Sequence, residues 1–342
     1  MNTNRVRAFL EEMKPVVIDA GKKYVEPRFS GKPYEIDFEA NPNDPANYVT
    51  ATDRHISGIA LARSREVFPG SYSEEDTKDR RYSGPISVWD PVDGTGGFVD
   101  ELYESCGTLG VVLDEHDRPV GALAYAPETR CFMMADELGF IYFEIDGINQ
   151  DIKEPADHIV AIQRTEAWNP KLDRFLEWFG KRRKVGVEVI EGGGPGSFGA
   201  SFGRYDANLF SGTVGIGNWK EWDVAPLYVL LGSAGWNLSD LRGNKHTFNN
   251  YDPRYFNGFL ATRLNHLGIM HEDIVRGIAE FTEIYRNELI APGHGATNGT
   301  IMVTDQIYKD WKASERRAEW LELVKTIPSR ERHRHLKRVR LV

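Results

Sequence analysis

The sequence predicts a fold of mixed helices and strands, α+β in its first half and α/β in its second. Residues 6–17 place apolar side chains at helical spacing near the N-terminus. Residues 84–147 carry short apolar runs between turn-forming residues, a pattern typical of strands and hairpins. Beyond residue 155, strand and helix patterns alternate, as they do in α/β proteins. The first half is therefore expected to be rich in strands, with helices at its start.

The first half has further recognisable segments. HISGIALARSREVF, residues 55–68, has helical apolar spacing, and Pro69 with Gly70 ends it. GPISVWDP, residues 84–91, has the composition of a short buried strand. Two hairpins are expected after it, at residues 106–128 with a turn at 115–118, and at residues 130–147.

The second half alternates in a regular way. Strands are expected at 158–164, 184–196 and 205–212, the second of them entering a loop, and helices at 169–182, 221–235 and 271–289. The acidic, polar segment 149–158 is the best candidate for a domain boundary. We therefore divide the chain into an N-terminal α+β domain at 1–155, a C-terminal α/β domain at 156–265, and a helical extension with a basic tail at 266–342.

Charge argues against one broad class of function. The net charge of −9 disfavours a general nucleic-acid binder, which needs a dominant basic surface. Residues 313–342 depart from this average, with nine Lys or Arg against four Glu. We interpret the run RHRHLKRVRL within them as a solvated helix face or a disordered end, and favour this over an arm that binds nucleic acid. Roles in dimer packing or in attracting an anionic substrate stay open.

The sequence also indicates a location. No stretch of about 18 apolar residues is present, so no membrane-spanning helix is expected. The N-terminal segment is amphipathic, unlike a signal peptide. Cys106 and Cys131 are expected to be reduced core thiols, with a disulfide between them as the alternative. A cytoplasmic protein is the resulting expectation.

Acidic residues gather at the ends of predicted elements. They are Asp53 in TATD, Glu74 and Glu75 in SEED, Asp90 and Asp93 in VWDPVDGT, and Asp223 in KEWDVAP. A single acidic residue at a helix start is usually only a cap. Together, however, these carboxylates suit Mg²⁺, which prefers oxygen ligands and substrate phosphate. A D-x-x-D turn stiffened by Pro91 could supply ligands to two metal ions.

The residues after Asp93 suggest a phosphate site. Gly94 has no side chain to block the approach of a phosphate oxygen to backbone N–H groups. A helix that begins there would offer further N–H groups to an anion. The hydroxyl of Thr95 could position a water molecule. Gly96 and Gly97 remain unexplained, because each costs about 1 kcal/mol in a helix interior.

These motifs resemble a known family. VWDPVDGT, preceded by TATD and SEED and followed by WDVAP, is similar to the inositol monophosphatase superfamily of Mg²⁺-dependent, lithium-sensitive phosphatases, over about residues 5–265. The resemblance implies a layered α-β-α-β-α sandwich of the sugar phosphatase type. It also implies a metal-dependent phosphoric monoester hydrolase that acts on a small phosphorylated metabolite and can form a homodimer.

The resemblance implies roles for individual residues. Glu74, Asp90 and the carbonyl of Val92 would hold one Mg²⁺; Asp90, Asp93 and Asp223 would hold a second; a third, weaker ion could lie near Glu74. Asp53, Glu74 and Thr95 would be catalytic. Thr95 with Asp53 would activate a water for in-line attack on phosphorus, without a phosphoenzyme. Substrate would contact Gly94, Thr95, Ser197 and Lys220.

The substrate itself is less constrained by the motifs. The segment KEWDVAP, with Lys220 before the Trp-Asp pair, is similar to the corresponding segment of 3′(2′),5′-bisphosphate nucleotidases. This resemblance favours a 3′-phosphonucleotide substrate such as adenosine 3′,5′-bisphosphate. Ile216 stands where inositol-phosphate enzymes typically place an acidic residue. The alternatives are a phosphatase of a sugar, inositol or other nucleoside phosphate, and a non-catalytic ligand-binding or regulatory family member.

Overall fold

The computed structural model describes most of the chain. The described residues are 3–29, 49–76, 82–99, 106–152, 158–163, 170–184, 186–191, 212–215, 219–250, 254–255, 258–263, 271–284 and 339–340. The predicted strand at 205–212 lies outside them except for its last residue.

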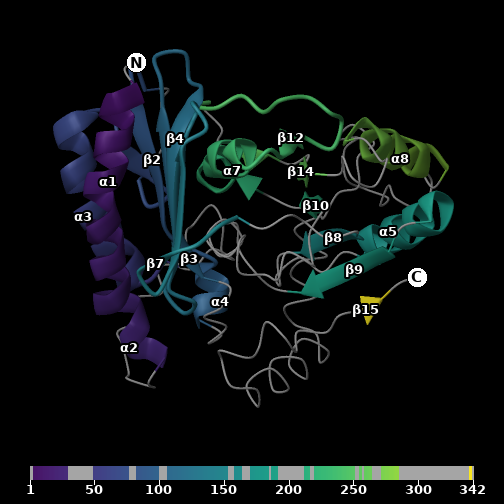
Figure 1. The fold of residues 1–342 in the computed structure, drawn as a ribbon, viewed down its shortest axis with the longest axis horizontal. Helices are drawn as coiled ribbons and strands as arrows, with labels where there is room; N and C mark the ends of the chain where they lie inside the picture. The colour runs from purple at the N-terminus through teal and green to yellow at the C-terminus, as the bar shows by residue number, and fades with distance from the viewer. Residues whose placement is uncertain are drawn as a thin grey trace.

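Two long helices cover one face of a first sheet (Figure 1). Helix α1 spans Thr3–Ala20 and α3 spans Ala51–Val67, so both predicted helices are confirmed. A short π-helix η1, Gly21–Val25, and helix α2, Glu26–Phe29, follow α1. The apolar stripe of α1 packs with side chains of the sheet and forms a buried core layer; its buried members are Val6, Phe9, Leu10, Met13 and Val17.

The first sheet has seven strands in sequential order, and only β1 and β2 pair in parallel. The strands are β1 Tyr72–Ser73, β2 Ile86–Asp93, β3 Gly107–Leu113, β4 Pro119–Ala126, β5 Cys131–Asp136, β6 Ile141–Ile145 and β7 Ile148–Asn149. The strand expected at 84–91 and the two expected hairpins are therefore present. Cys106 and Cys131 are buried thiols and not a disulfide, as expected.

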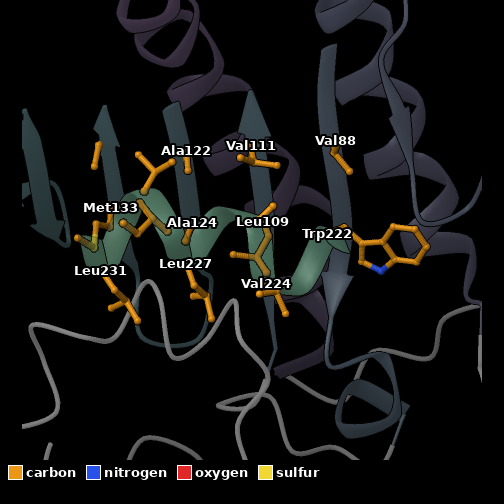
Figure 2. Packing of buried hydrophobic residues seen from close by; sticks show 14 of the residues in the cluster. Val88, Leu109, Val111, Ala122, Ala124, Met133, Trp222, Val224, Leu227 and Leu231 are labelled. Atoms are coloured by element: carbon orange, nitrogen blue, oxygen red, sulfur yellow. The ribbon is translucent and has the colours of Figure 1, made fainter. Parts of the chain in front are cut away.

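Helix α7, Glu221–Ser233, covers the opposite face of this sheet. Figure 2 shows it lying across the strands, so that apolar side chains of the helix meet those of the sheet. The labelled contacts involve Val224, Leu227 and Leu231 of the helix and Leu109, Val111, Ala122, Ala124 and Met133 of the strands. Because both faces of the sheet are covered, its strands are apolar on both sides.

A second sheet follows, in the order β12-β14-β10-β8-β9-β15. Its strands are β8 His158–Gln163, β9 Gly186–Glu191, β10 Gly212–Gly215, β12 Asn237–Ser239, β14 Phe259–Thr262 and β15 Val339–Arg340. Strands β10, β8 and β9 are parallel, and α5, Pro170–Arg183, connects β8 to β9. The expected alternation of strands and helices is thus present. A separate pair, β11 Trp219–Lys220 and β13 Arg254–Tyr255, lies beside α7.

The layers run helix, sheet, helix, sheet, helix. Helix α7 also packs against β12, and α5 packs on β9 and on α8, His271–Ile284 (Figure 1). This arrangement confirms the predicted layered α-β-α-β-α sandwich. Among the described residues, no helix is long and apolar enough to cross a membrane.

The basic C-terminal run differs from its prediction at two residues. Val339 and Arg340 form β15, which pairs antiparallel with β9, where a solvated helix face or a disordered end was expected. The pairing covers the backbone groups that β9 would otherwise expose as the last strand of the sheet. The other residues of this run lie outside the described part of the chain.

Candidate functional site

Strand β2 carries Asp90 and Asp93 at its end, and both are at most 2% exposed. The pairing of β2 with β3 shifts register between these two residues, and the Thr108 hydroxyl donates to the Pro91 carbonyl at 2.8 Å. In a regular strand, residues three apart point to opposite faces. The irregularity instead lets both carboxylates reach one place. A stiffened turn was expected here, and the structure has a bulged strand.

Asp223 approaches the same place from helix α7. It is the third residue of that helix, and its Oδ2 accepts the backbone N–H of Lys220 at 2.7 Å. One carboxylate oxygen from each of Asp90, Asp93 and Asp223 lies within 4.8 Å of the others, and all three residues are buried. The structure therefore brings together three of the predicted metal ligands, from segments 130 residues apart in sequence order.

The electrostatics of this cluster suit a cation. Burial, followed by the charges of Glu74, Asp93 and Asp223, holds the pKa of Asp90 well above its ordinary value. The buried Oδ1 of Asp90 has no hydrogen-bond partner among the described residues. A buried carboxylate oxygen that lacks a donor and lies in a cluster of like charges is costly unless a positive charge joins it. Hard divalent cations such as Mg²⁺ bind oxygen ligands of this kind.

Asp53 both caps a helix and belongs to the site. Its Oδ2 accepts the backbone N–H of Thr50 at 2.7 Å and also the Thr50 hydroxyl, which completes the cap of α3. Its Oδ1 accepts the hydroxyl of Thr95 at 3.1 Å. Burial raises the pKa of Asp53 to about 7; hydrogen bonds from Thr50 oppose this shift, and the charge of Glu74 adds to it. The cap and the catalytic interpretation are therefore compatible.

Glu74 interacts electrostatically with both groups. It follows β1, and its backbone N–H donates to the carbonyl of Trp89, the residue before Asp90, at 2.9 Å. Its charge contributes to the raised pKa of both Asp90 and Asp53. It is not one of the three mutually close carboxylates described above.

The neighbours of Glu74 have different surroundings. Asp76 is held by the guanidinium of Arg65 at 3.2 Å and by the N–H of Ser73 at 3.1 Å. Burial, with the charges of Asp53 and Glu74, raises the pKa of Glu75 to about 9. The sequence pointed to Glu75 through the SEED motif but gave it no role. Thr50 was likewise only part of the TATD motif.

The predicted phosphate contacts are placed in part. Gly94 has a positive φ of 82°, and helix α4, Thr95–Val99, begins directly after it. The Thr95 hydroxyl also lies 2.8 Å from the Val92 carbonyl. Lys220 is half-buried, with Nζ 5.6 Å from the ring centre of Trp222. Ser197 and Ile216 lie outside the described residues.

The chain is similar to known proteins in sequence and in fold. The family model described as "Inositol monophosphatase family" matches residues 9–272. An inositol monophosphatase (IMPase) from Thermotoga maritima is 18% identical, over 80% of this chain and 98% of its own, with a TM-score of 0.59. CysQ from Bacteroides thetaiotaomicron, a bacterial member of the family, is 20% identical over 72% of this chain and 94% of its own, with a TM-score of 0.56.

A third solved structure contains relevant ligands. It is an IMPase/NADP phosphatase complexed with Mg²⁺ and phosphate, 16% identical over 79% of this chain and 95% of its own, with a TM-score of 0.57. No curated protein sequence matches the chain. At these low identities, the structural similarity shows a shared fold alone. The family model, in contrast, matches most of the chain. The chain therefore belongs to the inositol monophosphatase family, whose members are metal-dependent phosphatases that hydrolyse phosphate monoesters.

Proposed function

We propose that this family member hydrolyses a small phosphorylated metabolite with the help of two or three Mg²⁺ ions, and that a 3′-phosphonucleotide is the favoured substrate. The observation that carries the proposal is the buried cluster of Asp90, Asp93 and Asp223. Thr95, just after β2, donates to Asp53 of α3, and this hydrogen-bonded pair joins Glu74 in the proposed catalytic set. We expect a cytoplasmic enzyme that can form a homodimer.

The ligand assignment follows the family resemblance. Glu74, Asp90 and the Val92 carbonyl would hold one ion, and Asp90, Asp93 and Asp223 a second, with a third near Glu74. The buried, mutually repelling carboxylates support two of these positions. When bound, Mg²⁺ neutralises charge on the phosphoryl group and on the leaving oxygen.

The residues beside the cluster would handle the attacking water. The single hydroxyl proton of Thr95 has two acceptors in reach, Asp53 Oδ1 and the Val92 carbonyl; in the reaction it would be donated to Asp53, which leaves the lone pairs of Thr95 Oγ1 to accept a hydrogen bond from water. As the water oxygen bonds to phosphorus, its proton moves through Thr95 to Asp53 and the bond from phosphorus to the ester oxygen breaks. The leaving oxygen takes a proton from solvent. Gly94 and the N-terminus of α4 would receive phosphate oxygens during this step.

Two features support a nucleotide substrate. Lys220 offers a half-buried cation at the start of α7, close to Asp223, where it could pair with a second phosphate. The fold also serves the protein called an IMPase/NADP phosphatase, so it can accommodate a nucleotide. Ile216, in place of an acidic residue, disfavours inositol recognition.

A phosphate-release screen tests the proposal. Purified protein with Mg²⁺ is offered adenosine 3′,5′-bisphosphate, inositol phosphates, sugar phosphates and mononucleotides. We expect the highest kcat/KM with the bisphosphate and loss of release in EDTA. In ¹⁸O-labelled water, the released phosphate should gain one oxygen from solvent. No release from any compound would contradict the phosphatase proposal, and preference for an inositol phosphate would contradict the nucleotide proposal.

The role of Lys220 has its own pair of variants. Lys220→Met removes the charge but keeps the backbone N–H that Asp223 accepts. It should raise KM for the bisphosphate by about 10- to 100-fold, since one charge-assisted hydrogen bond contributes roughly 1.5–3 kcal/mol. Lys220→Arg should retain most of the affinity. If Lys220→Met affected mono- and bisphosphates equally, the second-phosphate contact would be wrong.

A further inference from the structure

Asn249 joins two parts of the chain that are far apart in sequence. Its side chain is fully buried, with Nδ2 donating to the Tyr82 carbonyl at 2.6 Å and Oδ1 accepting the Tyr82 N–H at 3.1 Å. Nδ2 also donates to Asp117 Oδ1 at 2.8 Å. The amide therefore holds both backbone groups of Tyr82, as a neighbouring strand would. Tyr82 and Asn249 are 167 residues apart.

The Tyr82 end of this link contacts the strand that leads into the SEED motif, residues 73–76. The Tyr82 ring stacks on Tyr72, with ring centres 4.7 Å apart and planes 12° from parallel. Tyr72 belongs to β1, which leads directly into Glu74. Tyr82 lies after the same SEED motif, whose continuation at 77–81 is outside the described residues. Asn249 thus holds the far side of the segment that carries Glu74.

The other end of the link lies on helix α7. The carboxylate of Glu221 is fully buried and accepts the backbone N–H groups of Asn249 and Asn250, the latter at 3.4 Å. Glu221 is the first residue of α7, two positions before Asp223. The backbone at Asn249 is therefore tied to the turn of α7 that presents Asp223.

The cost of this arrangement indicates a specific role. A carboxylate and an amide are both removed from water, and Asn249 has a left-handed φ of 57°. The apolar packing of α7 on the sheet is strong but non-directional. Hydrogen bonds have direction, and those of Glu221 restrict how far the first turn of α7 can slide or rotate.

We propose that Asn249 and Glu221 are positioning residues that set the distance between Asp223 and the carboxylates of Asp90 and Glu74. This inference rests on the proposed metal site. Asp223 comes from the second half of the chain, whereas the other acidic ligands come from the first. The link through Asn249 connects the two sources directly, so its loss should weaken Mg²⁺ binding before it affects contacts with substrate.

Three variants of the link test this inference. Asn249→Gly removes the amide and keeps the left-handed backbone accessible. Glu221→Ala removes the acceptor, and Glu221→Gln keeps a neutral one of the same shape. For each we would measure the Mg²⁺ concentration at half-maximal activity, kcat and KM, and separately the Mg²⁺ concentration at half of the maximal rise in Tm.

Asn249→Gly and Glu221→Ala should raise both Mg²⁺ midpoints about tenfold, as is typical when a residue that orients a metal ligand is lost. KM should change less, and Glu221→Gln should restore most of the wild-type midpoint. The double variant should lose less than the product of the single losses, because both residues act through one link.

Arg7→Met provides a control that removes an ion pair outside this link. Arg7 Nε lies 2.9 Å from the fully buried carboxylate of Asp136, an ion pair between α1 and the end of β5. This variant should lower Tm and leave the Mg²⁺ midpoints unchanged. If Asn249→Gly and Glu221→Ala behaved in the same way as Arg7→Met, their role would be structural only and the inference would be wrong.

Two further outcomes remain decisive. If Asn249→Gly and Glu221→Ala did not fold, Asp117→Gly, which removes one acceptor of Asn249 at a position with φ of 61°, should raise the midpoints by a smaller factor. Unchanged midpoints in that variant would overturn the inference. If the wild-type protein released no phosphate from any substrate, the proposed function would fail. The Mg²⁺ concentration at half of the maximal rise in Tm would still test the link.

Discussion

The hydroxyl of Thr95 lies 3.1 Å from Oδ1 of Asp53, while Oδ2 of the same carboxylate caps helix α3. One side chain therefore fixes the start of a helix and orients a hydroxyl at the end of β2. The cap leaves Asp53 little freedom to rotate, so the position of Oδ1 is set by the fold. This preorganisation is what a water-positioning pair needs.

Replacing Thr95 by valine should abolish most activity without unfolding the protein. Valine keeps the branched shape but cannot donate to Asp53 or accept from water. We expect kcat to fall by about 10²–10⁴, the usual contribution of a positioned proton-transfer group. Thr95→Ser keeps the hydroxyl and should retain at least a tenth of the rate. Steady-state kinetics with saturating Mg²⁺ would measure both; similar rates for Thr95→Val and wild type would exclude the hydroxyl from catalysis.

Asp93→Asn should separate activity from stability. It replaces a buried anion by a neutral group of the same shape, and so removes one partner from the repelling cluster with Asp90 and Asp223. Activity should fall by at least about 10², since a metal ligand is lost. In EDTA, however, the Tm of the variant should exceed that of wild type, because like-charge repulsion in the buried cluster is relieved.

The two measurements check each other in this variant. Differential scanning fluorimetry gives Tm in EDTA and in Mg²⁺, and phosphate release gives activity. Addition of Mg²⁺ should raise the Tm of Asp93→Asn less than that of wild type. A variant with near-wild-type rates would contradict the assignment of Asp93 as a ligand. A lower Tm in EDTA would show that Asp93 makes stabilising contacts that outweigh the repulsion.

The pH dependence of the metal-free protein follows from the raised pKa values. The pKa of Asp53 rises from 3.8 to about 7, and that of Glu75 from 4.5 to about 9. A carboxyl with a raised pKa in the folded state holds its proton there and loses it in the unfolded state. Its contribution to stability is therefore full below about pH 4 and declines as pH rises towards the folded-state pKa, by up to about 1.4 kcal/mol per pH unit for each extra proton held.

Mg²⁺ should oppose this trend, because it would bind the ionised form of the clustered carboxylates, among them Asp90, whose pKa is also raised. The rise in Tm on adding saturating Mg²⁺ should therefore grow between pH 5 and pH 8. The lowered pKa values of His246 and His271 change stability with pH in the opposite direction, with or without Mg²⁺. Their effect cancels when the Tm without Mg²⁺ is subtracted from the Tm with Mg²⁺ at each pH. A Mg²⁺-induced rise in Tm that did not change with pH would contradict the prediction.

Local patterns were sufficient to predict the elements that carry the site. The apolar run before Asp90, the hairpins after it and the helix at Asp223 all follow from spacing and turn residues, because short-range geometry determines them. The family motif then pointed to acidic residues that lie on or next to these elements. The structure adds that Asp90, Asp93 and Asp223 meet.

Features that depend on distant contacts were not predictable. The bulge between Asp90 and Asp93 depends on pairing with β3, and a turn was expected instead. The link between Asn249 and Tyr82 joins residues that no local pattern relates. Glu221 precedes a recognised motif but looks like an ordinary acidic residue at a helix start, and only its burial sets it apart.

Gly110 leaves room for the ring of Trp89, the residue before Asp90. A Cβ at Gly110 would lie 2.7 Å from Trp89 Cη2, and a neighbouring ring carbon would be closer still. The Trp89 indole N–H is held by Ser64 Oγ at 2.9 Å and Ser87 Oγ at 2.8 Å, so the ring cannot move without losing these bonds. Because Trp89 directly precedes Asp90, a displaced ring would shift the metal ligand.

Gly110→Ala should therefore lower both stability and Mg²⁺ affinity. We expect a loss of about 1–3 kcal/mol in the free energy of unfolding, as for other overpacked cores, together with a higher Mg²⁺ concentration at half-maximal activity. Gly121→Ala is a matched control: its Cβ would overlap Val6 of α1, and the three atoms nearest to it belong to Val6 and Leu10. It should lower Tm by a similar amount and leave the Mg²⁺ midpoint unchanged. Equal midpoints in the two variants would show that Asp90 tolerates movement of the neighbouring ring.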